Sequence, residues 1–263
     1  MLKIDDISKT FFPGTVNERK ALQDLSLELA ESDFVTVIGS NGAGKSTLLN
    51  TISGRLPIDS GSIRIDGAEV SRMPEHRRAK YLGRVFQDPM AGTAPDLTIE
   101  QNLSLALKRG QSRGLGRGTT SARREHFKDE LATLELGLEN RLKTKVGLLS
   151  GGQRQALSLL MAGFTQPRIL LLDEHTAALD PQRAALVTAL TKKIVENDGL
   201  TTLMVTHNME QAIALGNRLI MMHEGRIIYQ ATAEQKKDLT VETLLGEFSK
   251  LKGASLGDRA LLN

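Results

Sequence analysis

The chain has 263 residues, of which 40% are apolar and 25% charged, as in an ordinary globular domain with its own hydrophobic core. No stretch approaches the roughly 18 to 20 uncharged apolar residues of a membrane span, and the absence of cysteine excludes disulfides, thiolate metal sites and a cysteine nucleophile. The net charge of +3 is mild, whereas the basic pI near 9.1 is also typical of proteins that bind nucleic acid, phosphate or an anionic membrane face. Aromatic residues make up only 3%, which argues against a base-stacking platform, and we expect no nucleic-acid partner. Asp5 and Asp6 stand where a signal peptide needs an apolar run, which argues against secretion.

Short apolar runs alternate with helical patterns along much of the chain. Asp180-Pro181 predicts a helix start, and apolar residues then recur at helical spacing until Asn197-Asp198-Gly199. Strands that alternate with helices indicate a mostly parallel sheet. The runs that predict its buried strands are residues 34–38, 169–172, 203–206 and 219–222.

Two turn signals predict antiparallel pairing elsewhere. Asp66-Gly67 follows the strand pattern of residues 62–65, and Glu224-Gly225-Arg226 separates residues 219–222 from residues 227–229. The sequence therefore predicts an α/β fold, with a mostly parallel sheet and an antiparallel β subdomain near the N-terminus.

The middle and the end of the chain differ from this core. Residues 88–163 have a predominantly helical pattern, interrupted by a basic, glycine-rich stretch at residues 108–118. That stretch is either a solvated loop or a contact with phospholipid headgroups or a membrane partner. Near the end, one short amphipathic helix with a frayed last ten residues is expected around Leu244, Leu245, Phe248 and Leu251.

A phosphate-binding motif follows the first buried strand directly. The template G-x-x-x-x-G-K-[ST] predicts backbone N–H groups wrapped around phosphate, with the next helix presenting its positive end to the same anion. Lys45 is expected to reach the β and γ phosphates, Ser46 to ligate Mg²⁺ and Thr47 to contact the α phosphate. The predicted nucleotide-binding residues of this loop are Gly39, Ser40, Asn41, Gly42, Ala43, Gly44, Lys45, Ser46 and Thr47.

Two carboxylates end the apolar strand at residues 169–172. Asp173 is placed to hold Mg²⁺, and Glu174 to accept a proton from an attacking water. Acidic residues also end strands for solubility alone. The phosphate-binding motif at residues 39–47, a P-loop, favours the functional interpretation, in which residues 169–174 form a Walker B strand.

A second helix start with exposed backbone N–H groups lies at Leu149-Ser150-Gly151-Gly152-Gln153. Ser150 and Gln153 have the spacing of a capping box, and Gly151 and Gly152 leave the backbone uncovered. Such an end attracts an anion, so it needs either another ligand or the nucleotide of another copy of the protein.

These motifs resemble those of the ABC ATPase family, whose signature is LSGGQ, and the resemblance covers nearly all of residues 1–235. Gln87 is similar to the family's Q-loop glutamine, which also serves Mg²⁺, Asp180 to its D-loop aspartate and His207 to its switch histidine. Phe11 stands at the place of the aromatic residue that stacks on adenine, with Phe12 as the rival choice. P-loop kinases and GTPases are excluded because neither needs LSGGQ.

The resemblance implies a domain plan and a dimer. A RecA-like core is expected at residues 1–87 and 164–235, a helical lobe at 88–163, the whole ABC domain at 1–246 and a tail at 247–263. Two copies are expected to pack head to tail with two ATP molecules between them. Each ATP is then held by the P-loop of one copy and by Ser150, Gly151, Gly152 and Gln153 of the other.

One departure from the family pattern lies beside this site. His175 stands where the family often has proline after the Walker B glutamate. A titratable ring there either alters the pH dependence of the reaction or is a packing substitution.

The resemblance also implies a role in transport. We expect the chain to hydrolyse ATP and to power uptake of a small organic solute, such as an amino acid, through separate membrane permease subunits. Its place is then the cytoplasmic face of the cell membrane, with an extracytoplasmic solute receptor as an indirect partner and residues 88–107 as the docking region. The alternative is a soluble, non-transport ABC ATPase resembling the iron–sulfur cluster assembly type.

Overall fold

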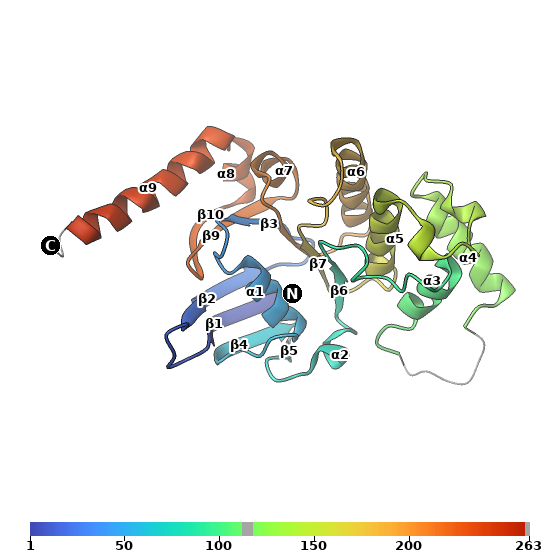
Figure 1. The fold of residues 1–263 in the computed structure, drawn as a ribbon, viewed down its shortest axis with the longest axis horizontal. Coiled ribbons are helices and arrows are strands. Elements are labelled where there is room, and N and C mark those ends of the chain that lie inside the picture. The colour runs from blue at the N-terminus through green and yellow to red at the C-terminus, as the bar shows by residue number, and fades with distance from the viewer. Residues whose placement is uncertain (112–117, 261–263) are drawn as a thin grey trace.

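Two β-sheets form the centre of the fold (Figure 1). The computed structural model describes residues 1–111 and 118–260, without the side chains of residues 251–260. The four-stranded sheet has the order β2-β1-β4-β5, and the six-stranded sheet has the order β10-β9-β3-β8-β7-β6. The strands are β1 (Leu2–Phe11), β2 (Arg19–Leu29), β3 (Phe34–Gly39), β4 (Ser60–Ile65), β5 (Ala68–Glu69), β6 (Leu82–Val85), β7 (Ile169–Asp173), β8 (Thr202–Val205), β9 (Arg218–His223) and β10 (Arg226–Ala231).

The six-stranded sheet confirms the predicted parallel core. β9, β3, β8, β7 and β6 pair in parallel, and only β10 runs antiparallel, against β9. All four apolar runs predicted as buried strands lie in this sheet, although β8 begins and ends one residue earlier than expected. The residues of β3 and β7 are almost all buried, as expected for a parallel sheet covered on both faces.

The antiparallel subdomain is confirmed as well. β1 pairs antiparallel with β2 and β4, and the turn from β4 to β5 has φ of 52° at Asp66 and 76° at Gly67, as a tight hairpin requires. Helix α1 (Lys45–Ser53) lies between this sheet and the six-stranded sheet (Figure 1). One core joins all three, because Ile4 and Ile63 of the small sheet, Leu48 of α1 and Leu171 of β7 belong to the same buried cluster.

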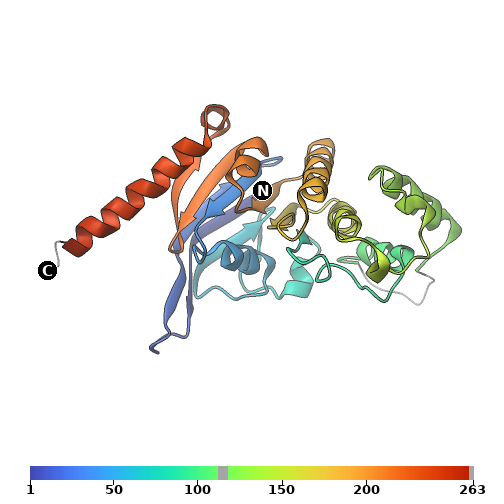
Figure 2. The ribbon, with the colours of Figure 1, turned by 45° about the horizontal axis from the view of Figure 1, so that its top comes forward.

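The helical lobe lies beyond β6, at the edge of the large sheet opposite β10 (Figures 1 and 2). It contains α3 (Ile99–Leu107), α4 (Ser121–Ala132), α5 (Gly151–Gly163) and the short 3₁₀ turns η1 (Leu138–Asn140) and η2 (Val146–Leu148). Residues 88–98 and most of residues 133–150 are not helical, so the predicted helical character of 88–163 was too broad. These segments consist mainly of turns and bends, and they form loops between the helices.

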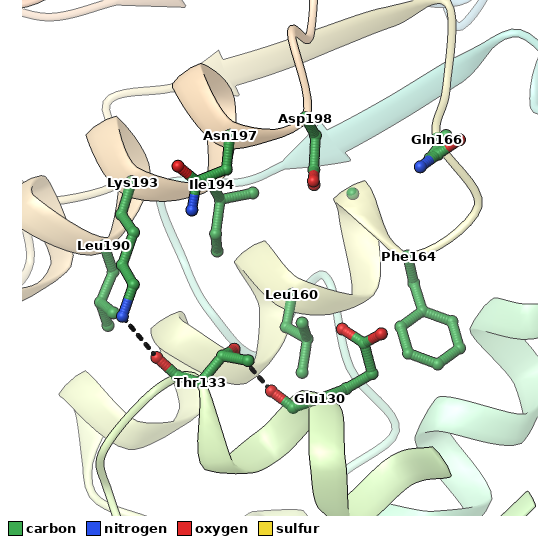
Figure 3. Close-up of a pocket in the computed structure, with 11 residues that line it drawn as sticks. Glu130, Thr133, Leu160, Phe164, Gln166, Leu190, Lys193, Ile194, Asn197 and Asp198 are labelled. Atoms are coloured by element: carbon green, nitrogen blue, oxygen red, sulfur yellow. Dashed lines mark hydrogen bonds between the residues drawn. The ribbon is translucent and has the colours of Figure 1, made fainter.

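The lobe and the core meet at a cavity of about 180 Å³ between α4, α5 and α6 (Pro181–Asn197), shown in Figure 3. Lys193 of α6 donates to the backbone oxygen of Thr133 at 3.3 Å and pairs with Glu135 at 3.2 Å. Beneath these polar contacts, Leu160 of α5 and Leu190 of α6 share the apolar cluster of the lobe. The junction is therefore apolar at its base and polar at its rim.

The basic, glycine-rich stretch is only partly described, since residues 112–117 lie outside the described part of the chain. At its start, Arg109 donates to the backbone oxygens of Ala162 and Met161 at 2.9 and 2.8 Å. These carbonyls end α5, so this arginine caps the signature helix at its C-terminus. For the rest of residues 108–118, a solvated loop and a contact with lipid headgroups or a membrane partner both stay predictions.

The C-terminal part differs from its prediction. The remaining helices are α2 (Glu75–Arg78), α7 (Met209–Ala214), α8 (Ala233–Lys237) and α9 (Val241–Ala260). The prediction of a short helix with a frayed last ten residues was wrong, because α9 continues to Ala260. This helix points away from the body of the molecule (Figures 1 and 2). Buried Leu244 anchors its first half against the cluster of α7 and β9, and the predicted division at residue 246 falls inside this helix. Across the described residues, no helix is both long and apolar enough to cross a membrane.

Candidate functional site

The P-loop joins β3 to α1 and leaves the start of that helix open. Gly44 takes the N-cap position with φ of 101°, and it has no side chain to cover the first N–H groups of α1. A Cβ there would lie 2.4 Å from the backbone oxygen of Ala21, so glycine is required for space as well as conformation. The open amides and the helix dipole together form an anion-binding end.

Lys45 closes the loop from its inner side. Its Nζ donates to the backbone oxygens of Gly39 and Ser40 at 2.7 and 3.1 Å. Burial lowers the pKa of Lys45, and the charges of Glu174 and Asp173 act in the opposite direction. The predicted phosphate cation and the two predicted Walker B carboxylates therefore act on each other across the same space.

A cavity of about 270 Å³ lies over the P-loop. Phe11 at the end of β1 lines it, whereas the neighbouring Phe12 is 67% exposed and does not. Glu174 also lines it. The P-loop residues that line it are Asn41, Gly42, Ala43, Gly44, Lys45, Ser46 and Thr47.

Glu174 and His207 form a pair at the carboxyl edge of the large sheet. Glu174 follows β7 with φ of 44°, a strained conformation for this residue type, and its N–H donates to the Val205 oxygen at 3.0 Å. The Nδ1 of His207 lies 3.5 Å from the Glu174 Oε2. A carboxylate and an imidazole at this distance can together hold and orient a water molecule.

The oxygen ligands beside the P-loop fit a magnesium ion bound with a nucleotide. Ser46 presents an exposed hydroxyl in the first turn of α1, and Asp173 ends β7 on the same side of the sheet. Nowhere in the described ranges do three His, Cys, Asp or Glu side chains gather as a metal site of their own. Mg²⁺ takes one or two protein oxygens and completes its shell with water and phosphate, so a serine hydroxyl and a carboxylate are donors of the type that it prefers.

Two arginines of the site were missed at the sequence level. Arg19 lines the P-loop cavity and donates to the Gly42 oxygen at 2.8 Å, and Arg84 of β6 pairs with Asp173 at 3.1 Å. Arg19 stands opposite Phe11 in the β1–β2 pairing. Only the strand register reveals these neighbours, and the register was not predicted.

The signature segment, residues 149–153, folds as predicted, but it does not line the P-loop cavity of its own chain. Ser150 caps α5 and accepts from the Gln153 N–H at 3.3 Å, while the Gln153 side chain accepts from the Ser150 N–H at 3.2 Å. A Cβ at Gly152 would lie 3.2 Å from Arg183, and one at Gly151 would lie 3.5 Å from Leu179. The signature turn thus borders the loop before α6, and it does not line the P-loop cavity.

Gln87 and Asp180 also lie outside that cavity. Gln87 follows β6 and is exposed. Asp180 caps α6 by accepting from the Arg183 N–H at 3.1 Å and pairs with the Arg183 side chain at 3.2 Å. Glu174 lines the P-loop cavity with Lys45, His207 pairs with Glu174, and the charge of Asp173 acts on Lys45. Gln87, Asp180 and the signature residues are not among the residues that line this cavity.

Comparisons with known proteins decide the family. The model of the family described as "ABC transporter" matches residues 22–177. The tyrosine transport ATP-binding protein of Clostridioides difficile (strain R20291) is 44% identical over 249 residues, which are 94% of this chain and 98% of that protein. The chain belongs to the ABC transporter family.

Solved structures of ABC cassettes have the same fold. A dimeric bacterial ABC transporter cassette, MJ0796, is 32% identical with a TM-score of 0.75, and 89% of this chain covers 99% of it. The dimer of the same cassette in a post-hydrolysis state bound to ADP and Pi gives 29% identity and a TM-score of 0.74 over the same shares of both chains. This chain is accordingly an ATP-binding subunit of an ABC transporter, whose ATP hydrolysis is coupled to transport.

In this ABC subunit His175 is a packing residue. Its side chain is 2% exposed, and its Nε2 lies 2.8 Å from the Thr191 Oγ1, which itself donates to the Val187 oxygen at 2.8 Å. Burial lowers the pKa of His175 from 6.5 to about 4. The ring is thus neutral near pH 7 and donates to Thr191, away from the P-loop cavity.

Proposed function

We propose that this subunit powers the uptake of an amino acid, tyrosine or a close analogue, through separate membrane permease subunits. The main support is the tyrosine transport ATP-binding protein, which is 44% identical and matches over nearly its whole length. Other chains of a transporter select the cargo. The ATP-binding subunit supplies the energy and binds those chains.

We further propose that two copies pack head to tail around two ATP molecules. The observation that carries this is the signature turn: Ser150 and Gln153 are organised as a complete helix start, yet they lie outside the nucleotide cavity of their own chain. The cassette MJ0796 is dimeric, including in a post-hydrolysis state bound to ADP and Pi. A second copy brings the Ser150 turn over the γ-phosphate that the P-loop leaves open.

The hydrolytic step follows from the arrangement around Glu174. Lys45 and the open amides of α1 bind the phosphates, and Phe11 stacks on the base at the other end of the cavity. Glu174 accepts a proton from the attacking water, and His207, 3.5 Å away, orients that water and the γ-phosphate. Ser46, Asp173 and Gln87 would hold Mg²⁺, which when bound would supply positive charge beside the β and γ phosphates. Asp180 transmits the state of one site to the other.

The proposed location is the cytoplasmic face of the cell membrane. Permease helices dock beside the exposed Gln87 and residues 88–107, and a solute receptor outside the membrane acts through the permease. The direct test is affinity purification from detergent-solubilised membranes. We expect the tagged chain to recover integral membrane subunits, whereas recovery of soluble partners alone would contradict the transport proposal.

The cargo is tested separately by uptake of labelled tyrosine in cells that lack this gene and are complemented with the wild-type chain or with Glu174→Gln. We expect the wild-type chain to restore uptake and the variant to leave it at the deletion level. Competition by unlabelled phenylalanine, leucine and glutamate measures how narrow the cargo class is. Equal uptake with both chains would exclude tyrosine.

The alternative role in iron–sulfur cluster assembly has less support. The relative that is 44% identical is a transport ATP-binding protein, and MJ0796 is a transporter cassette, which favours transport. The purification above separates the two roles, because an assembly ATPase is expected to co-purify with soluble partners.

A further inference from the structure

Arg84 connects three parts of the nucleotide site. It lies on β6, and its guanidinium donates to Asn50 Oδ1 at 2.9 Å and to Ser53 Oγ at 3.1 Å, both on α1. A second terminal nitrogen donates to Asp173 Oδ2 at 3.1 Å. The same guanidinium lies over the Phe86 ring, 4.6 Å from its centroid.

The burial of this group shows that it is more than a surface ion pair. The side chains of Arg84 and Asp173 are only 10% and 15% exposed. Within the described part of the chain, the buried Nε–H of Arg84 finds no acceptor. Burying a charge and an unpaired donor costs stability that an apolar side chain at the same place would not cost, and such costs concentrate at functional sites.

In residues 1–111 and 118–260, the hydrogen bonds of the Asp173 carboxylate engage only one of its two oxygens. Arg84 holds Oδ2, so Oδ1 is the atom left for a ligand. Because the guanidinium is flat and rigid, its two terminal nitrogens hold fixed positions relative to each other, one at Asp173 and the other at α1. Its other bonds to Asn50 and Ser53 place that carboxylate relative to α1, the helix that begins with Lys45 and Ser46.

We propose that Arg84 is a positioning residue that aims Asp173 at the nucleotide-bound magnesium ion and couples this aim to the Gln87 loop. The coupling runs through Phe86, which stacks on Arg84 and immediately precedes Gln87. A displacement of the Gln87 loop by a permease then changes the hold of Arg84 on Asp173. This proposal rests on the proposed role of Asp173 as a magnesium ligand.

The test measures binding, not turnover. The dissociation constant of a fluorescent ATP analogue is determined in Mg²⁺ and in EDTA for the wild-type chain and for Arg84→Gln. We expect the tightening by Mg²⁺ to fall about 10-fold, as for other residues that orient metal ligands, while the affinity in EDTA stays within about 2-fold. Arg168→Gln is the matched control, because Arg168 forms an exposed pair with Asp66 at 3.2 Å. Equal weakening in both buffers would show a merely structural role and overturn the proposal.

Two further variants keep the test decisive if Arg84→Gln folds poorly. Arg84→Lys keeps the charge without the fork, so we expect it to lose part of the tightening by Mg²⁺ with its urea midpoint unchanged. Phe86→Leu removes the stacking partner and should reduce the tightening about 2- to 5-fold. Full tightening in both variants would overturn the proposal.

A double variant separates this proposal from the assignment of Asp173. Asp173→Asn is expected to remove the tightening by Mg²⁺, and adding Arg84→Gln should then change nothing more. A further loss in the double variant would mean that Arg84 acts independently of Asp173, which contradicts the proposal. If Asp173→Asn alone keeps the full tightening, the magnesium role of Asp173 fails and the proposal fails with it, while the ATPase function of the family stands.

Discussion

The P-loop and the signature turn both lead into the start of a helix, but the two helix starts are built differently. At the P-loop, Gly44 leaves α1 uncapped, and the phosphate itself is the expected partner of the open amides. At the signature, Ser150 and Gln153 form a complete capping box, so α5 is finished without a ligand. The first helix start thus needs the nucleotide, whereas the second is rigid before the nucleotide arrives and can close on it from another chain.

The largest expected effect concerns the reaction at the P-loop side. Glu174→Gln keeps the size and the strained backbone of this residue but cannot accept a proton. We expect turnover to fall at least about 100-fold while ATP binding persists and dimer accumulates, measured by phosphate release and by light scattering after gel filtration. Glu210→Gln is the control, since Glu210 is an exposed carboxylate of the adjoining groove. Normal turnover of Glu174→Gln would remove Glu174 from its assigned role.

A mixing experiment asks whether the two helix starts act within one chain or between chains. Lys45→Ala removes the phosphate cation, and Ser150→Arg blocks the signature turn, so we expect neither variant alone to hydrolyse ATP. A mixed dimer contains one site with an intact P-loop and an intact signature turn, so an equal mixture should regain up to about a quarter of the wild-type rate. A mixture as inactive as its components would contradict the head-to-tail arrangement.

A smaller effect is expected from His175, which lies between the Walker B strand and α6. Its pKa is about 4 in the folded chain and 6.5 when solvated, so the unfolded chain binds more protons between these values. The free energy of unfolding should therefore fall as the pH drops below 6.5, by about 2 kcal/mol between pH 7.5 and pH 5. Urea unfolding at several pH values measures this loss. His175→Gln should flatten the profile over this range, and an unchanged profile would contradict a buried neutral ring.

The smallest effect is expected at the rim of the junction between lobe and core. Lys193→Ala removes an ion pair with Glu135 whose side chains are 47% and 80% exposed, so it should lower the free energy of unfolding by less than about 1 kcal/mol. Leu160→Ala, in the apolar base of the same junction, should cost about 3 kcal/mol. Equal costs in urea unfolding would mean that the lobe is held by its polar rim.

The sequence predicted those parts that short patterns encode. The buried strands, the P-loop and the capping box at Ser150 each depend on spacing within a few residues, and each was found where expected. The same reasoning failed for the length of α9, because apolar contacts at Leu244 and Phe248 extend a helix whose later residues have no periodic pattern.

Contacts across strands could not be predicted in this way. Arg84 meets Asp173, 89 positions away, because β6 and β7 are neighbours with Val85 beside Leu172. Arg19 meets the P-loop because β2 places it opposite Phe11. Both contacts depend on sheet order and register, which hydrophobic patterns leave open.

The backbone bond between Glu174 and Val205 has a consequence for timing. It belongs to the ladder that joins β7 to β8, and His207 lies two residues beyond Val205. The proposed proton acceptor and its histidine therefore follow two strands that are hydrogen-bonded to each other in one chain. In the proposed cycle, the second copy then has to bring only its signature turn to the nucleotide, because the pair at the end of the large sheet exists before the two chains meet.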